Sequence, residues 1–126
     1  MSPTETEVVE SRLYHRDVYL PKCLRRPIFQ GPLSYTWHAK QAAQRDRLGV
    51  IPLPERFSSH GAFLIEVETV NGFPVKQVWR IPLDKKLHLV MVITVEGTVK
   101  TVWLNRSSDR HCKLKTDIYQ KERIFT

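Results

Sequence analysis

The chain has 126 residues, of which 41% are hydrophobic and 26% are charged, so it has the size of one globular domain. No apolar run approaches the roughly 18 residues of a membrane span. The polar, acidic beginning is unlike a secretory signal. We therefore expect a cytoplasmic protein with no membrane partner.

The chain is strongly basic, with a formal net charge of +7 and a pI near 9.7. The first ten residues hold three glutamates and no lysine or arginine, so removing them leaves a body of charge +10. Such a surface attracts polyanions, of which nucleic acid is the commonest, and salt weakens the attraction. An acidic protein partner, or solubility alone, remains the alternative interpretation.

The two cysteines, Cys23 and Cys112, do not form a metal-binding pattern. Zinc sites use three or four ligands that lie in closely spaced pairs, and none is present. We expect neither a metal nor another cofactor. A disulfide between the two cysteines is the alternative to free thiols, although a cytosolic setting disfavours it.

The first quarter of the chain differs from the rest. Residues 11–32 carry three prolines, mostly basic charges and no helical period, with one short predicted strand at Val18–Leu20. We interpret residues 1–32 as an extended basic N-terminal arm and residues 33–126 as a single α+β domain. The domain begins with a short β-type run at Leu33–Trp37.

One helix is predicted in the domain. Small and apolar residues recur at helical spacing from His38 to Leu48, and Gly49 is a natural end. A proline-broken loop, Ile51–Pro54, follows.

Four strands come next, at residues 61–70, 75–81, 87–95 and 98–104. Asn71-Gly72 is typical of a type I′ hairpin turn, and Glu96-Gly97 is a weaker turn signal. The predicted fold class is therefore α+β, with one main helix packed on a four-stranded, largely antiparallel sheet.

The turns also predict which residues lie opposite each other. Because side chains alternate between the faces of a strand, Arg80 should share a face with apolar side chains, which favours a cleft there. The predicted pairs are Phe63–Arg80, Ile65–Val78, Val67–Lys76, Val90–Trp103 and His88–Asn105.

Two segments resemble a known group of proteins. Tyr35–Gly49 reads Tyr-Thr-Trp-His-Ala and continues to Arg and Gly, and Val99–His111 is a Thr-Val-aromatic run followed by Asn, Asp and His. These segments resemble the strand–helix opening and last strand of small bacterial and phage domains grouped with the RelE and BrnT toxins. The resemblance covers about residues 33–119. The tyrosine-bearing basic C-terminus of RelE-type toxins is matched only loosely, by Tyr119 and Arg123.

This resemblance implies a RelE-like fold, shared with barnase-type and EndoU-type ribonucleases, and RNA cleavage without metal. Such chemistry needs a base, an acid and cations for the charged transition state. Histidine suits the proton transfers, and the arginine fork suits phosphate. We expect His38 and His111 to transfer protons and Arg45 and Arg80 to stabilise phosphate.

Further residues are candidates for contacts with RNA through charge, hydrogen bonding or base stacking. Each also has a structural interpretation, as a solvated cation, a sheet-end hydrogen bond or a core side chain. His15 and His60 have no such surroundings and are expected at the surface, and Trp103 is expected in the core. The RNA-binding candidates are Lys76, Trp79, Asn105, Arg106 and Arg110.

The leading hypothesis is an RNA-binding protein with metal-independent endoribonuclease activity of the RelE/BrnT-like toxin type, which implies an antitoxin partner. The alternative is a non-enzymatic phage or mobile-element protein that binds and modulates an acidic host protein. A DNA-binding regulator is disfavoured because no helix-turn-helix is evident. A nuclease requires its histidines and arginines to converge in one cleft.

Overall fold

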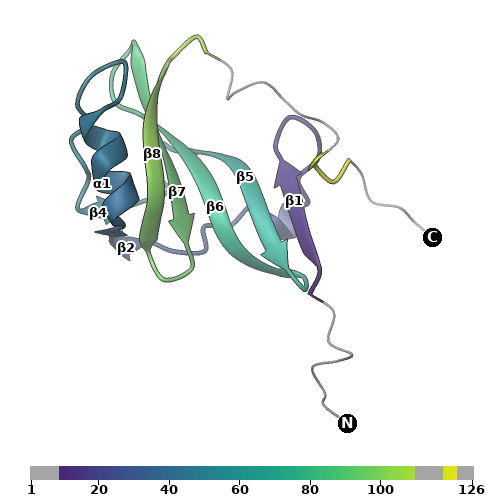
Figure 1. Cartoon of the computed structure of the whole chain (residues 1–126). Helices are drawn as coiled ribbons and strands as arrows, with labels where there is room; N and C mark the ends of the chain where they lie inside the picture. The colour runs from purple at the N-terminus through teal and green to yellow at the C-terminus, as the bar shows by residue number, and fades with distance from the viewer. Residues whose placement is uncertain (1–8, 110–117, 122–126) are drawn as a thin grey trace.

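The computed structural model describes residues 9–109 and 118–121. Its main feature is a six-stranded sheet with the strand order β1–β5–β6–β7–β8–β3 (Figure 1). The central strands form an antiparallel meander of β5 (Phe63–Val70), β6 (Phe73–Pro82), β7 (Leu87–Thr94) and β8 (Thr98–Arg106).

The predicted four-stranded sheet is wrong, because two further strands lie at its edges. β1 (Ser11–His15) pairs antiparallel with β5, and β3 (Ser34–Tyr35) pairs parallel with β8, which makes the sheet mixed. The expected strand at Val18–Leu20 is also wrong, since only Tyr19 forms a bridge there, to His15. β1 is short and polar and lies at an edge, so its sequence carries little strand signal.

The predicted hairpin registers are right for one pair of strands and partly wrong for the other. In β7–β8, His88 lies opposite Asn105 and Val90 opposite Trp103, as expected. In β5–β6, Phe63 lies opposite Arg80, but an irregularity between Leu64 and Glu66 places Glu68 opposite Lys76, and a second one after Glu68 restores the predicted register. A bulge shifts the pairing by one residue, so Lys76 and Val67 point to opposite faces.

The Asn71-Gly72 turn itself is as predicted. Asn71 has a φ of 50° and Gly72 a φ of 85°, and a type I′ turn requires positive φ at both positions.

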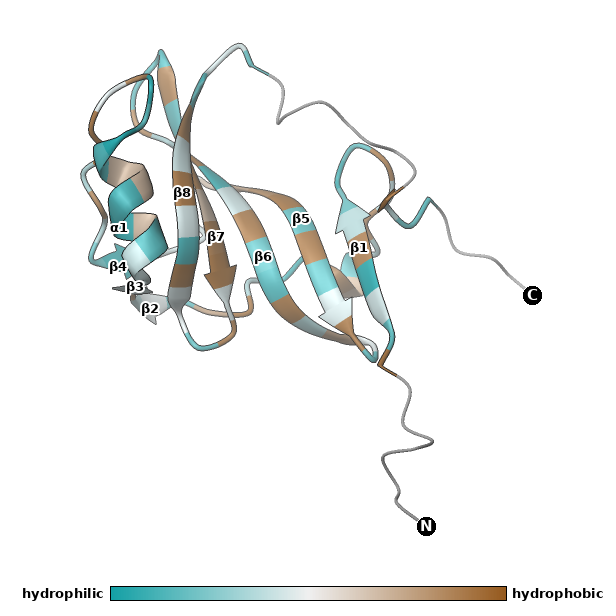
Figure 2. Cartoon of the chain, in the orientation of Figure 1, coloured by the Kyte–Doolittle hydropathy of each residue, from teal (hydrophilic) through white to brown (hydrophobic). Residues whose placement is uncertain are grey.

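The sheet has two distinct faces. The covered face, with Trp79, Met91 and Leu104, packs against Ala39 and Ala43 of α1 (Trp37–Gln44). The second face is marked by the cluster Ile65, Val78 and Val90, with Trp103 packed against it. Figure 1 shows α1 beside the β7–β8 side of the sheet, far from β1, and Figure 2 shows brown and teal alternating along β5 and β6.

The helix begins near the predicted position and ends earlier. The Thr36 hydroxyl accepts a hydrogen bond from the Ala39 N–H and caps the helix at its start. The last helical residue is Gln44. Just beyond the helix, the Asp46 carboxylate accepts hydrogen bonds from the Leu104 N–H at 3.1 Å and the Leu48 N–H at 3.0 Å, which fastens the end of the helix to β8.

A strap of residues 19–30 crosses the covered face between β1 and β2 (Gly31–Pro32), which pairs with β4 (Arg56–Phe57). The strap includes the 3-10 turn η2 (Lys22–Leu24). Its Phe29 ring occupies the space above Gly97, where any Cβ would lie 2.3 Å from the ring.

The Gln77 amide joins this strap to the sheet. Its Oε1 accepts hydrogen bonds from the Ile28 N–H and from the Trp79 indole N–H, both at 3.0 Å. Its Nε2 donates to the Arg26 carbonyl at 2.7 Å. Because Gln77 is only 1% exposed, water cannot replace these bonds.

We predict that Gln77→Leu strongly destabilises the fold. The substitution leaves two N–H groups and a carbonyl without their partner, at about 1–3 kcal/mol for each buried group, so we expect a loss of about 3 kcal/mol in the free energy of unfolding. Urea denaturation measures it. The matched control Gln44→Leu, on the exposed side of α1, should change stability little, and equal effects would contradict the role of Gln77.

Candidate nucleic-acid interface

The predicted catalytic residues do not meet in one cleft. His38 lies exposed in the first turn of α1 and Arg45 lies exposed at its C-cap, on the helix that packs on the covered face. Arg80 lies opposite Val90 and therefore points to the second face. The sheet separates these groups, so the predicted convergence is wrong for these three residues. His111 and Arg110 lie outside the described residues.

Two predicted RNA contacts are also placed away from Arg80. Trp79 is only 4% exposed and packs on Phe57 with ring centroids 5.2 Å apart, so its indole is a core side chain that cannot stack a base. The prediction failed because Trp79 points to the covered face. Lys76 forms an ion pair with Glu68 at 3.0 Å, nearer the Asn71-Gly72 turn.

Arg80 is held rigidly where β6 ends, β7 begins and β8 ends. Its Nε donates to His88 Nδ1 at 2.7 Å, and its Nη2 donates to the carbonyl of Arg106 at 2.8 Å and that of Ser107 at 3.5 Å. Arg106 itself is exposed, and its backbone N–H donates to Asp109 Oδ2 at 2.8 Å. The guanidinium is thus oriented by two strands.

The electrostatics of this pair decide the proton position on His88. Burial lowers the pKa of Arg80, and the Asp109 carboxylate opposes that shift. Burial and the neighbouring Arg80 charge lower the pKa of His88, and Asp84 opposes them. Because Arg80 donates to Nδ1, the neutral imidazole carries its proton on Nε2 and offers an N–H donor.

An exposed aromatic ring lies beside this pair. Phe63 is 45% exposed, and its ring centroid lies 6.5 Å from that of His88 at an interplanar angle of 30°. The guanidinium carbon of Arg16 lies 5.8 Å from the Phe63 centroid, within cation–π range. We call Phe63, Arg16, Arg80 and His88 the Phe63 site. A hollow of about 260 Å³ is lined by Arg16, Phe63 and Arg80 of this site, and also by Asp17, Ile65, Ser107 and Asp109.

Asn105, a predicted RNA contact, lies next to this site. It is opposite His88 in the β7–β8 ladder and is only 7% exposed. Its Nδ2 has no hydrogen-bond partner within residues 9–109 and 118–121. A buried polar atom of this kind can serve a ligand.

Sequence reasoning missed the aromatic part of the site and one buried histidine. The sequence predicted Phe63 only as the apolar residue opposite Arg80. Arg16 reaches Phe63 because β1 pairs with β5, where the Arg16 N–H donates to the Ile65 carbonyl at 2.9 Å. His15, expected at the surface, is fully buried, accepts the Asp17 N–H at 3.0 Å and contacts the Tyr119 ring.

The described ranges contain neither a cluster of metal ligands nor a membrane-spanning helix. No group of three or more His, Cys, Asp or Glu side chains there could hold a metal ion. In the same residues, no helix has both the length and the apolar character needed to cross a membrane.

We predict that His88 titrates below its ordinary pKa of 6.5. The unfolded chain then takes up a proton before the folded chain does, so this part of the stability is complete above pH 6.5 and is lost as pH falls through the folded pKa. NMR titration of the His88 ring measures the shift, and Arg80→Gln should raise the pKa. A value at or above 6.5 in the native protein would contradict the Arg80–His88 geometry.

Comparison with known proteins adds no relative. No family model, no curated protein and no solved structure matches the chain. The interpretation therefore rests on the geometry of the Phe63 site.

Proposed function

We propose that the protein binds single-stranded RNA through the Phe63 site. The observation that carries this proposal is the exposed Phe63 ring with a guanidinium and an imidazole against it, opposite the fixed guanidinium of Arg80. Aromatic rings beside arginines are the usual means by which proteins hold unpaired bases.

Each group has a role in this proposal. A base stacks on the exposed part of Phe63, which contributes about 1–3 kcal/mol per stacked base and tolerates any sequence. Arg16 and Arg80 bind the phosphates on either side, since a guanidinium can donate two parallel hydrogen bonds to phosphate oxygens. A double helix keeps its bases stacked inside and offers none to Phe63.

The acidic residues of the hollow favour RNA over DNA. Asp17 and Asp109 line the same hollow as Phe63 and Arg80. A carboxylate repels phosphate but accepts a hydrogen bond from a ribose 2′-hydroxyl, which DNA lacks. The basic chain, with its net charge of +7, supplies the long-range attraction for the strand.

The geometry supports binding better than cleavage. The Nδ1 atom of His88, which could accept a proton, is already hydrogen-bonded to Arg80. His88 therefore offers its Nε2–H as a hydrogen-bond donor to a phosphate oxygen. A general base needs a free nitrogen that accepts a proton, and Nδ1 is not free. Cleavage stays a hypothesis that involves His111.

We predict that Phe63→Ala weakens binding of a fluorescent 12-nucleotide single-stranded RNA at least about fivefold, through loss of base stacking. Arg16→Gln should weaken binding and reduce the salt dependence of the binding constant by about one phosphate contact. Fluorescence anisotropy at several salt concentrations measures both.

Two matched controls separate this site from general charge and hydrophobicity. Phe73→Ala removes a ring that is 74% exposed at the hairpin turn, and Arg47→Gln removes an exposed arginine beyond α1. Both should leave the affinity nearly unchanged. If Phe63→Ala binds as tightly as Phe73→Ala, or if duplex RNA binds as well as single strands, the proposal is wrong.

We predict that RNA bound at the Phe63 site stays intact in excess EDTA, because His88 is not available as a base. Gel electrophoresis after incubation with pure protein measures this. Fragments that form in EDTA and disappear in the His111→Ala variant would contradict this expectation and support the nuclease hypothesis.

A further inference from the structure

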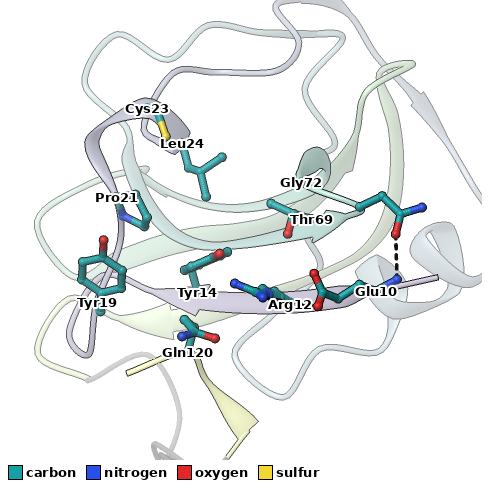
Figure 3. A pocket seen from close by; sticks show the side chains of 11 residues that line it. Glu10, Arg12, Tyr14, Tyr19, Pro21, Cys23, Leu24, Thr69, Gly72 and Gln120 are labelled. Carbon is teal, nitrogen blue, oxygen red and sulfur yellow. Dashed lines mark hydrogen bonds and ion pairs between the residues drawn. The ribbon is translucent and has the colours of Figure 1, made fainter. Parts of the chain in front are cut away.

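A larger hollow, of about 620 Å³, lies between β1, the end of β5 and the strap. Its walls include Arg12 and Tyr14 from β1, Thr69 from β5, and Tyr19 and Leu24 from the strap (Figure 3). None of its lining residues lines the hollow at Phe63. The proposed RNA contact gives this second hollow no role.

One buried group in this hollow calls for a ligand. Thr69 is only 2% exposed, and its hydroxyl has no hydrogen-bond partner in the part of the chain that the structure describes. Figure 3 shows this hydroxyl directed into the hollow. Because a buried hydroxyl without a partner destabilises a protein, a ligand that hydrogen-bonds to it gains affinity.

A donor and an acceptor stand side by side at the polar end of the hollow. Arg12 Nη2 lies 3.3 Å from Glu10 Oε2, and the two side chains are 47% and 57% exposed, so both can be reached by a ligand. Hydrogen bonds with Tyr14 and Glu10 raise the pKa of Arg12. Asn71 fixes the Glu10 backbone, since the Glu10 N–H donates to Asn71 Oδ1 at 2.8 Å and the Asn71 N–H donates to the Glu10 carbonyl at 2.7 Å.

The other end of the hollow is apolar and aromatic. The Tyr14 and Tyr19 rings have centroids 6.3 Å apart and are tilted by 60°, so no ring fits between them. Tyr14 is almost fully buried, while Tyr19 and Leu24 are half-buried and keep apolar surface toward the hollow. A planar ring can pack on this surface with its polar edge toward Glu10 and Arg12.

We propose that this hollow binds a nucleobase-type ring, and guanine in particular. The guanine edge carries a carbonyl oxygen next to two N–H donors. The Arg12 guanidinium complements the oxygen, the Glu10 carboxylate complements the donors, and the Thr69 hydroxyl completes the set. The base comes either from a free nucleoside or from an RNA strand, and both share this chemistry.

The test is calorimetric titration of the full chain with guanosine. We expect guanosine to bind, and 1-methylguanosine, which lacks one donor of the edge, to bind at least about tenfold more weakly. Glu10→Ala and Thr69→Val should each weaken guanosine binding by a similar factor. Glu10→Ala keeps the backbone bonds to Asn71 and removes an exposed side chain, so it should fold.

Two controls make the result specific. Glu96→Ala removes an exposed glutamate in the β7–β8 turn, and Arg47→Gln removes an exposed arginine beyond α1. Both should bind guanosine like the native chain. Because Glu10 and Thr69 do not line the hollow at Phe63, failure of the RNA proposal leaves this test intact. No binding at millimolar guanosine, or equal binding by native chain, Glu10→Ala and Thr69→Val, would overturn the proposal.

A second titration, in the Phe63→Ala background, identifies the source of the base. Oligouridine carrying one terminal guanosine is compared with oligouridine alone and with free guanosine. Tighter binding of the guanosine-bearing strand than of free guanosine assigns the hollow to RNA. Equal binding of the two assigns it to the nucleoside. Equal binding of both strands, while free guanosine still binds, also assigns the hollow to the free nucleoside.

Discussion

The structure depends on the burial of β7 on both of its faces. Leu89, Val90 and Met91 are consecutive and fully buried, although neighbouring residues of a strand point in opposite directions. Both faces of the sheet must therefore be covered around this strand. α1 and the strap cover one face, and the side chains around Trp103 and Arg80 shield the other. Surfaces with different chemistry follow from this single constraint.

The separation of the faces explains which functional residues can cooperate. His38 and Arg45 belong to the layer that covers one face, while Arg80 and His88 belong to the other. Because successive side chains of a strand lie on opposite faces of the sheet, each residue contributes to only one of these two surfaces. Thus Trp79 completes the core while its neighbour Arg80 lies in the proposed RNA contact.

Local sequence signals predicted the hairpins well, because turn chemistry and alternation act over a few residues. Asn71-Gly72 fixed one turn, and the β7–β8 register followed from Glu96-Gly97. The number of strands was wrong because β1 pairs with β5 across more than fifty residues, and its polar sequence does not show that contact. The irregularities in the β5–β6 pairing also leave no mark in the sequence that distinguishes them from regular strand.

The same distinction applies to the site. The pairs Phe63–Arg80 and His88–Asn105 were predictable because each lies within one hairpin. The approach of Arg16 to Phe63 and the wall formed by Tyr14 and Tyr19 depend on β1 and the strap, so neither could be predicted from the sequence. The face that α1 covers was also undetermined, which is why Trp79 was assigned to solvent and RNA.

The hydrogen bonds from Arg80 to the carbonyls of Arg106 and Ser107 would link the binding of a phosphate to the position of the backbone at the end of β8. The guanidinium that would meet a phosphate also fixes the backbone where the chain leaves β8. A phosphate that draws this group toward itself must weaken those bonds, so occupancy and the direction of the departing backbone are thermodynamically linked. Ligand arrival at one corner of the sheet could thus be transmitted along the polypeptide without any rearrangement of the central strands.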